Sequence, residues 1–265
     1  MRRLLTFTLL LVFAMPHSER LAAFLHSVEH KTGKKVYVLQ VQDDAGLSHG
    51  GVGSLGIYAL MRPGASDEEV AHEVLHGELN LEGFVATRAA NPYAATMPLA
   101  GLLSANLQDF VIHPILDRRA RSVGFPQNHV AISHATEFRQ QLLSIAGTVN
   151  EADRLMVAAN AMGIAEVLQR GYDPSHDLQT LSSEKLPKAL ALSEKLLQQF
   201  PPLLAITPEQ SFARAKSILA FLDHETTKLA GNPPSQFLRI VNPLIEPPLD
   251  AQRERVIRQA FLGDK

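Results

Sequence analysis

The chain has 265 residues, of which 46% are hydrophobic and 20% are charged, so it can bury a substantial core as one domain or as a catalytic unit with an extension. Its formal net charge is only −2 and lysine and arginine are spread along the chain, so no large basic surface for nucleic acid is expected. The absence of cysteine excludes disulfides and cysteine-ligated metal sites.

Residues 1–17 have the layout of a secretory signal. Met1-Arg2-Arg3 supplies positive charge, and residues 4–14 are almost entirely apolar. This run is shorter than the about 20 residues that cross a membrane, so no stable membrane span is expected. With a signal the chain would be secreted or periplasmic. The alternative is that Met15 is the true start, that an extraneous extension precedes it, and that the chain is cytoplasmic.

The next segment predicts one helix and then short strands. Apolar residues at helical spacing predict a helix over 18–32 that ends before Gly33. β-Branched residues predict a strand over 35–41, and residues 55–60 are also strand-like. The glycine-rich stretch 46–56 carries little side-chain bulk and is expected to be a flexible loop at the rim of a cleft.

The most informative segment is Ala71-His72-Glu73-Val74-Leu75-His76-Gly77, which contains a His-Glu-x-x-His sequence. Ser66 and Glu69 form the pattern of a capping box, so a helix should begin at Ser66. On a helix, residues four apart lie on one face, and His72 and His76 can therefore bind one metal ion. Glu73 is placed beside that ion to act as a general base.

This segment, preceded by the strand-like run 55–60, resembles the active-site helix and adjoining edge strand of zincin metallopeptidases. The resemblance covers about residues 35–125. It implies one catalytic Zn²⁺ ion, a peptide or protein substrate, and Glu73 activating a zinc-bound water. No subfamily is identified, because the glycine and third histidine of the extended metzincin motif do not follow His76.

A catalytic zinc normally has three protein ligands and one open position, so a third ligand is needed. Asn106, Asp109 and His113 are three and four residues apart and share one face of a second predicted helix. Asp109 is the preferred ligand, with orientation of His72 or His76 as its alternative role. His113 is the next choice. Weaker candidates are the acids Glu78, Glu82 and Glu151.

Helical signals dominate the rest of the chain. The expected fold is α+β and mainly α, with a zincin-like small sheet and active-site helix followed by a helical extension. Residues 18–130 would form the catalytic region, and residues 131–265 a helical region packed on it. A long helix is expected over 98–122, bent or divided at Pro114.

Two functions compete. The first is a zinc-dependent metallopeptidase that hydrolyses peptide bonds. The second is a non-catalytic helical interaction protein that retains a zincin-like core. A peptidase also needs a donor for the oxyanion of its transition state. The sequence does not rank the candidates, which are Tyr58, Tyr93, Tyr172, His129 and His176.

Overall fold

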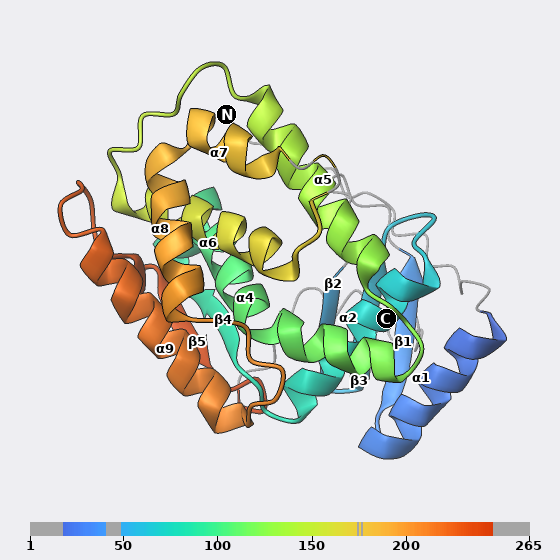
Figure 1. Ribbon diagram of the computed structural model, residues 1–265. Helices are drawn as coiled ribbons and strands as arrows, with labels where there is room; N and C mark the ends of the chain where they lie inside the picture. Colours follow the sequence, from blue (N-terminus) through green and yellow to red (C-terminus); the bar gives the residue numbers. More distant parts are fainter. Residues whose placement is uncertain (1–17, 41–48, 174, 176, 246–265) are drawn as a thin grey trace, which may run out of the picture.

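The computed structural model describes residues 18–40, 49–173, 175 and 177–245 (Figure 1). The expected signal segment, and a short last helix predicted from Asp250, lie outside these residues. The described helices are α1 (Glu19–Thr32), α2 (Asp67–Leu81), α3 (Pro92–Ala95), α4 (Pro98–Ser122), α5 (Asn128–Ser144), α6 (Arg154–Arg170), α7 (Leu178–Lys185), α8 (Pro187–Gln199) and α9 (Pro208–Glu225), with a short 3₁₀ helix, η1 (Pro234–Gln236). The described strands are β1 (Lys35–Gln40), β2 (His49–Val52), β3 (Gly56–Met61), β4 (Ala86–Ala89) and β5 (Leu238–Val241).

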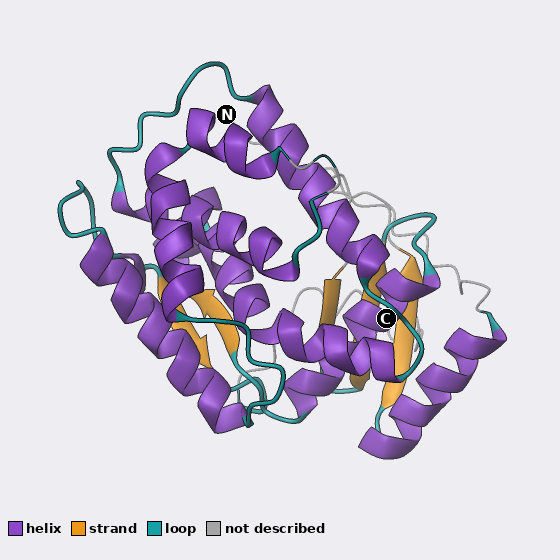
Figure 2. Ribbon diagram, in the orientation of Figure 1, coloured by secondary structure: helices purple, strands orange, loops and turns teal. Residues whose placement is uncertain are grey.

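The fold is α+β and mainly helical, as the sequence predicts. Figure 2 shows strands in two small sheets among many helices. The larger sheet has the order β1-β3-β2, in which β1 is parallel to β3 and β2 is antiparallel to it. The smaller sheet pairs β4 with β5, which lies near the end of the described chain.

The expectation that the strand before the active-site helix is an edge strand is wrong. That strand, β3, lies in the centre of its sheet, and every residue of it is buried. The edge strand beside it is β2, which forms from part of the glycine-rich stretch expected to be a loop. Small residues allow this arrangement, because β2 lies directly against α2.

Gly50 of β2 lies directly against the backbone of α2. A Cβ atom built on Gly50 would lie 2.0 Å from the backbone oxygen of Glu73. Replacing Gly50 with alanine should therefore destabilise the fold by about 1–3 kcal/mol, because backbone must move to accommodate the methyl group. Denaturation in urea measures this loss.

Gly101 provides the matched control for that substitution. It lies in α4, and a Cβ atom there would meet nothing within 4 Å. Gly101→Ala should leave stability unchanged or raise it by up to about 1 kcal/mol, since alanine is the better helix former. Equal stability of the two variants would show that β2 does not pack on α2 in this way.

The main hydrophobic core does not divide at residue 130. That position lies inside α5, and one cluster of buried residues includes Val74 and Leu107 from one side and Met162 and Leu219 from the other. A second, smaller cluster covers the opposite face of the three-stranded sheet. The expected catalytic and helical regions therefore share one core.

Helix α4 runs through this core and packs against α2, α6 and α9. Pro114 lies inside it without dividing it, so the bend or break expected there does not end the helix. Within the described residues, α4 is the one helix long and apolar enough to cross a membrane. Since 56% of its most apolar window is buried among other elements, we treat α4 as a core helix.

Candidate metal centre

Helix α2 presents His72 and His76 on one face, as the sequence predicts. The capping box is formed: the Ser66 side chain accepts from the Glu69 backbone, and the Glu69 side chain accepts from the Ser66 backbone. Both imidazoles are buried, and their Nε2 atoms lie 3.2 Å apart. The two rings therefore point at a common position.

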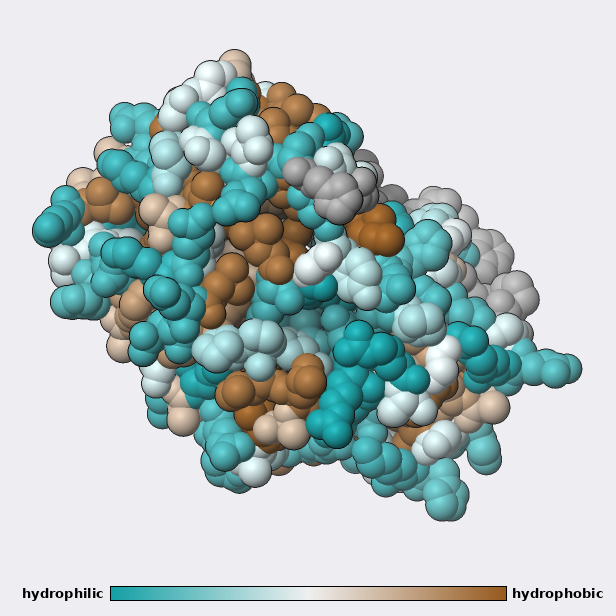
Figure 3. Space-filling model, in the orientation of Figure 1, coloured by the Kyte–Doolittle hydropathy of each residue, from teal (hydrophilic) through white to brown (hydrophobic). Residues whose placement is uncertain are grey.

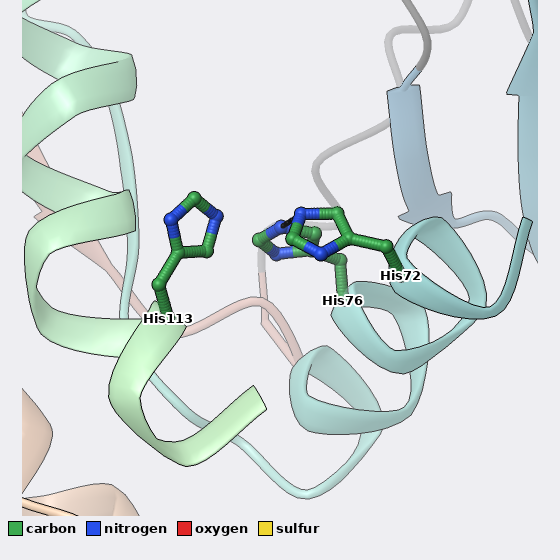
Figure 4. A group of neighbouring side chains, drawn as sticks. All are labelled: His72, His76 and His113. Carbon is green, nitrogen blue, oxygen red and sulfur yellow. Dashed lines mark hydrogen bonds between the residues drawn. The ribbon is translucent and has the colours of Figure 1, made fainter. Parts of the chain in front are cut away.

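Helix α4 brings His113 to the same position. One ring nitrogen from each of His72, His76 and His113 lies within 4.8 Å of the others, and all three residues are buried. Figure 4 shows the three rings converging from α2 and α4. Three imidazoles around one point form a ligand set suited to zinc.

Asp109, the preferred third ligand from the sequence, is outside this group. It lies one helical turn before His113, and its Oδ1 atom is 3.6 Å from His113 Nε2. The structure thus places His113, the second choice, with the two histidines, and leaves Asp109 beside them.

The protonation of His72 follows from its neighbour Gln127. The Gln127 amide nitrogen donates to the Phe125 carbonyl oxygen at 3.1 Å, so its Oε1 atom must face His72. That oxygen lies 2.8 Å from His72 Nδ1 and can only accept, so Nδ1 carries the proton. The lone pair of His72 is therefore on Nε2, which faces His76.

The same logic applies to His113. Its Nδ1 atom lies 2.6 Å from a carboxylate oxygen of Glu166 on α6, which accepts the Nδ1 proton. His113 Nε2 is buried and has no hydrogen-bond partner among the described residues. A buried nitrogen lone pair without a donor, beside the lone pair of His72, is what a metal cation would satisfy. The residues present therefore fit a metal ion.

The imidazoles of His72 and His113 are expected to be neutral. Burial is the first cause that holds the pKa of each well below 6.5, and the neighbouring histidines and the Arg170 guanidinium add to it. A metal binds neutral imidazole, so these side chains need not lose a proton on metal binding near pH 7.

Glu166 should support metal affinity through His113. Replacing Glu166 with alanine should weaken zinc binding by about 10–100-fold, since a ligand histidine loses the acceptor that orients it. Glu166→Gln keeps an oxygen acceptor and should lose less. Titration against a chromophoric chelator measures both, and an unchanged affinity in Glu166→Ala would contradict the role given to this hydrogen bond.

Glu73 lies beside the histidines and against β2. Burial raises the pKa of its carboxyl to about 8, although a hydrogen bond from the Gly50 backbone opposes the shift. Burial also raises the pKa of Asp109 well above 3.8, and the nearby carboxylates of Glu166 and Glu73 raise it further. A bound cation would favour ionisation of both acids.

The raised pKa of Glu73 predicts a stability difference in metal-free protein. A carboxyl with a pKa of about 8 in the fold and 4.5 when exposed contributes stability below pH 4.5 that is lost as pH rises toward 8. As pH rises between these values, the free energy of unfolding of metal-free Glu73→Gln should therefore come to exceed that of metal-free wild type by about 1–3 kcal/mol. The expected difference is below the full value of the pKa shift because Glu73 is partly exposed. Urea denaturation at pH 5 and pH 8 measures it; a constant difference would contradict it.

Several acids that the sequence offered as ligands serve other contacts. Glu78 pairs with Lys31, and Glu82 pairs with Arg119. Glu151 accepts from two backbone N–H groups at the start of α8, at 2.6 and 2.8 Å. None of them belongs to the three-histidine group.

The structure places the candidate oxyanion donors in different surroundings. Tyr58 lies in the hydrophobic cluster on the opposite face of the sheet, and Tyr93 is 69% exposed. Tyr172 donates to Asn128, and His129 is exposed on α5. His176 lies outside the described residues.

Sequence reasoning missed residues of α5 and α6 that border the site. Arg170 makes two hydrogen bonds to Asp117, at 2.9 and 3.2 Å, and its guanidinium also approaches His113. His134 is a fourth imidazole, with its ring centroid 6.2 Å from that of His72. Glu166 and Arg170 are four residues apart, as are His113 and Asp117. This matched spacing is the signal in the sequence that could have indicated two helix faces in contact.

Comparison with protein-family models, curated proteins and solved structures finds no match to this chain. The interpretation of the site therefore depends on the residues and geometry described above.

Proposed function

We propose that this chain is a metal-dependent peptidase, with zinc held by His72, His76 and His113 and with Glu73 as the general base. One observation carries the proposal. Three buried imidazoles converge on a single point, two of them with Nδ1 hydrogen-bonded to an acceptor, and a carboxylate follows the first in sequence. Three ligands leave a zinc ion one open position, as in catalytic sites.

The metal, when bound, would polarise a substrate carbonyl and make water more acidic. Glu73 would remove a proton from that water and pass it to the leaving amine. The Gly50 backbone N–H donates to the Glu73 carboxylate and holds it against β2. Asp109 would adjust the charge around His113, and it remains the alternative third ligand.

Strand β2 supports a peptide as the substrate class. It is the edge strand of its sheet, with β3 as its one neighbour among the described strands. It also lies against Glu73 through Gly50. An extended peptide can pair with an edge strand by backbone hydrogen bonds, which would carry its carbonyl groups past the site.

Activity against an unselected substrate tests the proposal. Zinc-loaded protein should cleave denatured casein or a mixed peptide library, with new termini found by mass spectrometry, and chelation should abolish cleavage. Protein that binds no zinc would overturn the proposal.

The alternative, a non-catalytic interaction protein, predicts neither metal-dependent cleavage nor sensitivity to Glu73→Gln. The face seen in Figure 3 shows hydrophobic residues in separate patches among hydrophilic ones. Large exposed hydrophobic residues are likewise distributed over several elements. This pattern does not favour a dedicated helical docking surface over the metal centre.

A further inference from the structure

His134 is a fourth imidazole at the edge of the metal centre. Its ring centroid lies 6.2 Å from that of His72 and 6.0 Å from that of His113. It is not a member of the group whose ligand atoms lie within 4.8 Å of one another. It is also partly exposed, whereas the three ligand candidates are buried. His134 is thus placed outside the ligand shell and toward solvent.

Helix α5 fixes the position of His134. Gln127, the residue before this helix, holds His72, and His134 follows it by seven residues. Seven residues are about two helical turns, so His134 follows the start of α5 by that distance along the helix. The His134 ring lies next to the rings of His72 and His113, so α5 places it at the edge of the candidate metal centre.

Arg170 determines which nitrogen of His134 can donate. Its Nη1 atom lies 3.4 Å from His134 Nδ1 and 3.5 Å from His113 Nδ1, and a guanidinium can only donate. His113 Nδ1 already donates its proton to Glu166, so His134 Nδ1 is the atom that can accept. Nδ1 then accepts, and the ring proton of the neutral imidazole is on Nε2. Because Arg170 is held by two hydrogen bonds to Asp117, this arrangement is rigid.

We propose that His134 is a catalytic residue that donates its Nε2 proton in a hydrogen bond to the oxygen of the scissile carbonyl as that oxygen gains negative charge. The inference rests on the proposed function and adds the transition-state donor that the sequence did not identify. No proton is transferred in this role, and the Arg170 contact keeps the donor on the correct nitrogen.

Kinetics give the first test. His134→Ala should lower kcat/KM by about 10²–10³-fold, mainly through kcat, because the contact strengthens only in the transition state. His134→Gln, which retains an N–H donor, should recover part of this loss. His129→Ala is the matched control, because His129 is exposed on the same helix. Zinc content should be unchanged in all three variants.

Anion binding gives a test that needs no substrate. In cobalt-loaded protein, inorganic phosphate has a metal-binding oxygen and further oxygens that can accept from His134, whereas azide offers the metal ligand alone. Absorption titrations should show phosphate binding weakened about tenfold or more in His134→Ala, and azide binding changed by less than about twofold.

The outcomes separate the two proposals. Equal phosphate affinity in wild type and His134→Ala, or equal weakening of phosphate and azide, would overturn the role of His134 alone. Loss of metal in His134→Ala would make this residue a ligand instead of a donor. Wild-type protein that binds neither zinc nor cobalt would overturn the proposed function, and this inference with it.

Discussion

Glu73→Gln should lower kcat/KM for peptide hydrolysis by about 10²–10⁴-fold while zinc remains bound. The substitution keeps the size of the side chain and an oxygen that can accept from the Gly50 backbone, so the contact between α2 and β2 should persist. It removes the group that we propose takes a proton from water. Activity and zinc content, measured on the same preparation, check the prediction.

Glu68→Gln is the control for this experiment. Glu68 lies on the same helix, five residues earlier, near its start. The Glu68→Gln variant should retain wild-type activity. It should lose a little helix stability, since the Glu68 carboxylate only complements the helix dipole. Full hydrolysis by zinc-loaded Glu73→Gln would remove Glu73 from the role of base, although the metal site itself could stand.

His113→Ala should weaken zinc binding by more than about 100-fold. Loss of a residue that only orients a ligand costs up to about 100-fold, and loss of a ligand should cost more. The reason is that His113 supplies one of three ligand atoms, from a different helix than the other two. Competition with a chelator measures the loss. Circular dichroism of the metal-free variant is needed as well, because the change also removes the hydrogen bond between His113 and the buried Glu166.

Asp109→Asn separates the two candidates for third ligand. Its carboxylate lies near His113 but outside the ligand group, so this variant should keep zinc with an affinity within about tenfold of wild type. If Asp109→Asn lost zinc and His113→Ala kept it, the sequence-based choice of Asp109 would be right and the three-histidine site wrong.

Helix α2 could be predicted because its signals are local. Ser66 and Glu69 cap it through contacts within one turn, and the spacing of His72 and His76 fixes their common face. The choice between Asp109 and His113 could not be made in this way. Both lie on one face of α4, and what distinguishes them is Glu166, which is 53 residues beyond His113 in the chain and fixes its ring.

Strands β2, β4 and β5 also depend on contacts that local sequence patterns do not indicate. Residues 49–52 carry two glycines and one β-branched residue, so their propensity for a strand is weak. They form one by pairing with β3, and the close approach of α2 leaves room only for glycine at position 50. Both are tertiary constraints. The pairing of β4 with β5 joins residues about 150 positions apart, which no local pattern can indicate.

Local sequence signals also predict a catalytic region up to residue 130 and a helical region after it, since helical patterns dominate beyond that position. The structure gives α6 a part in the metal centre through Glu166 and Arg170. The helical half therefore holds His113 in place, and removing it should disrupt the candidate metal centre.

The central claim is that His72, His76 and His113 bind one metal ion. A crystal structure of zinc-loaded protein, with anomalous diffraction recorded on both sides of the zinc absorption edge, tests it most directly. We expect one zinc per chain, with the Nε2 atoms of the three histidines at about 2.0–2.1 Å and no protein atom in the fourth position. Zinc bound by Asp109 in place of His113, or no zinc peak at this position, would contradict the account.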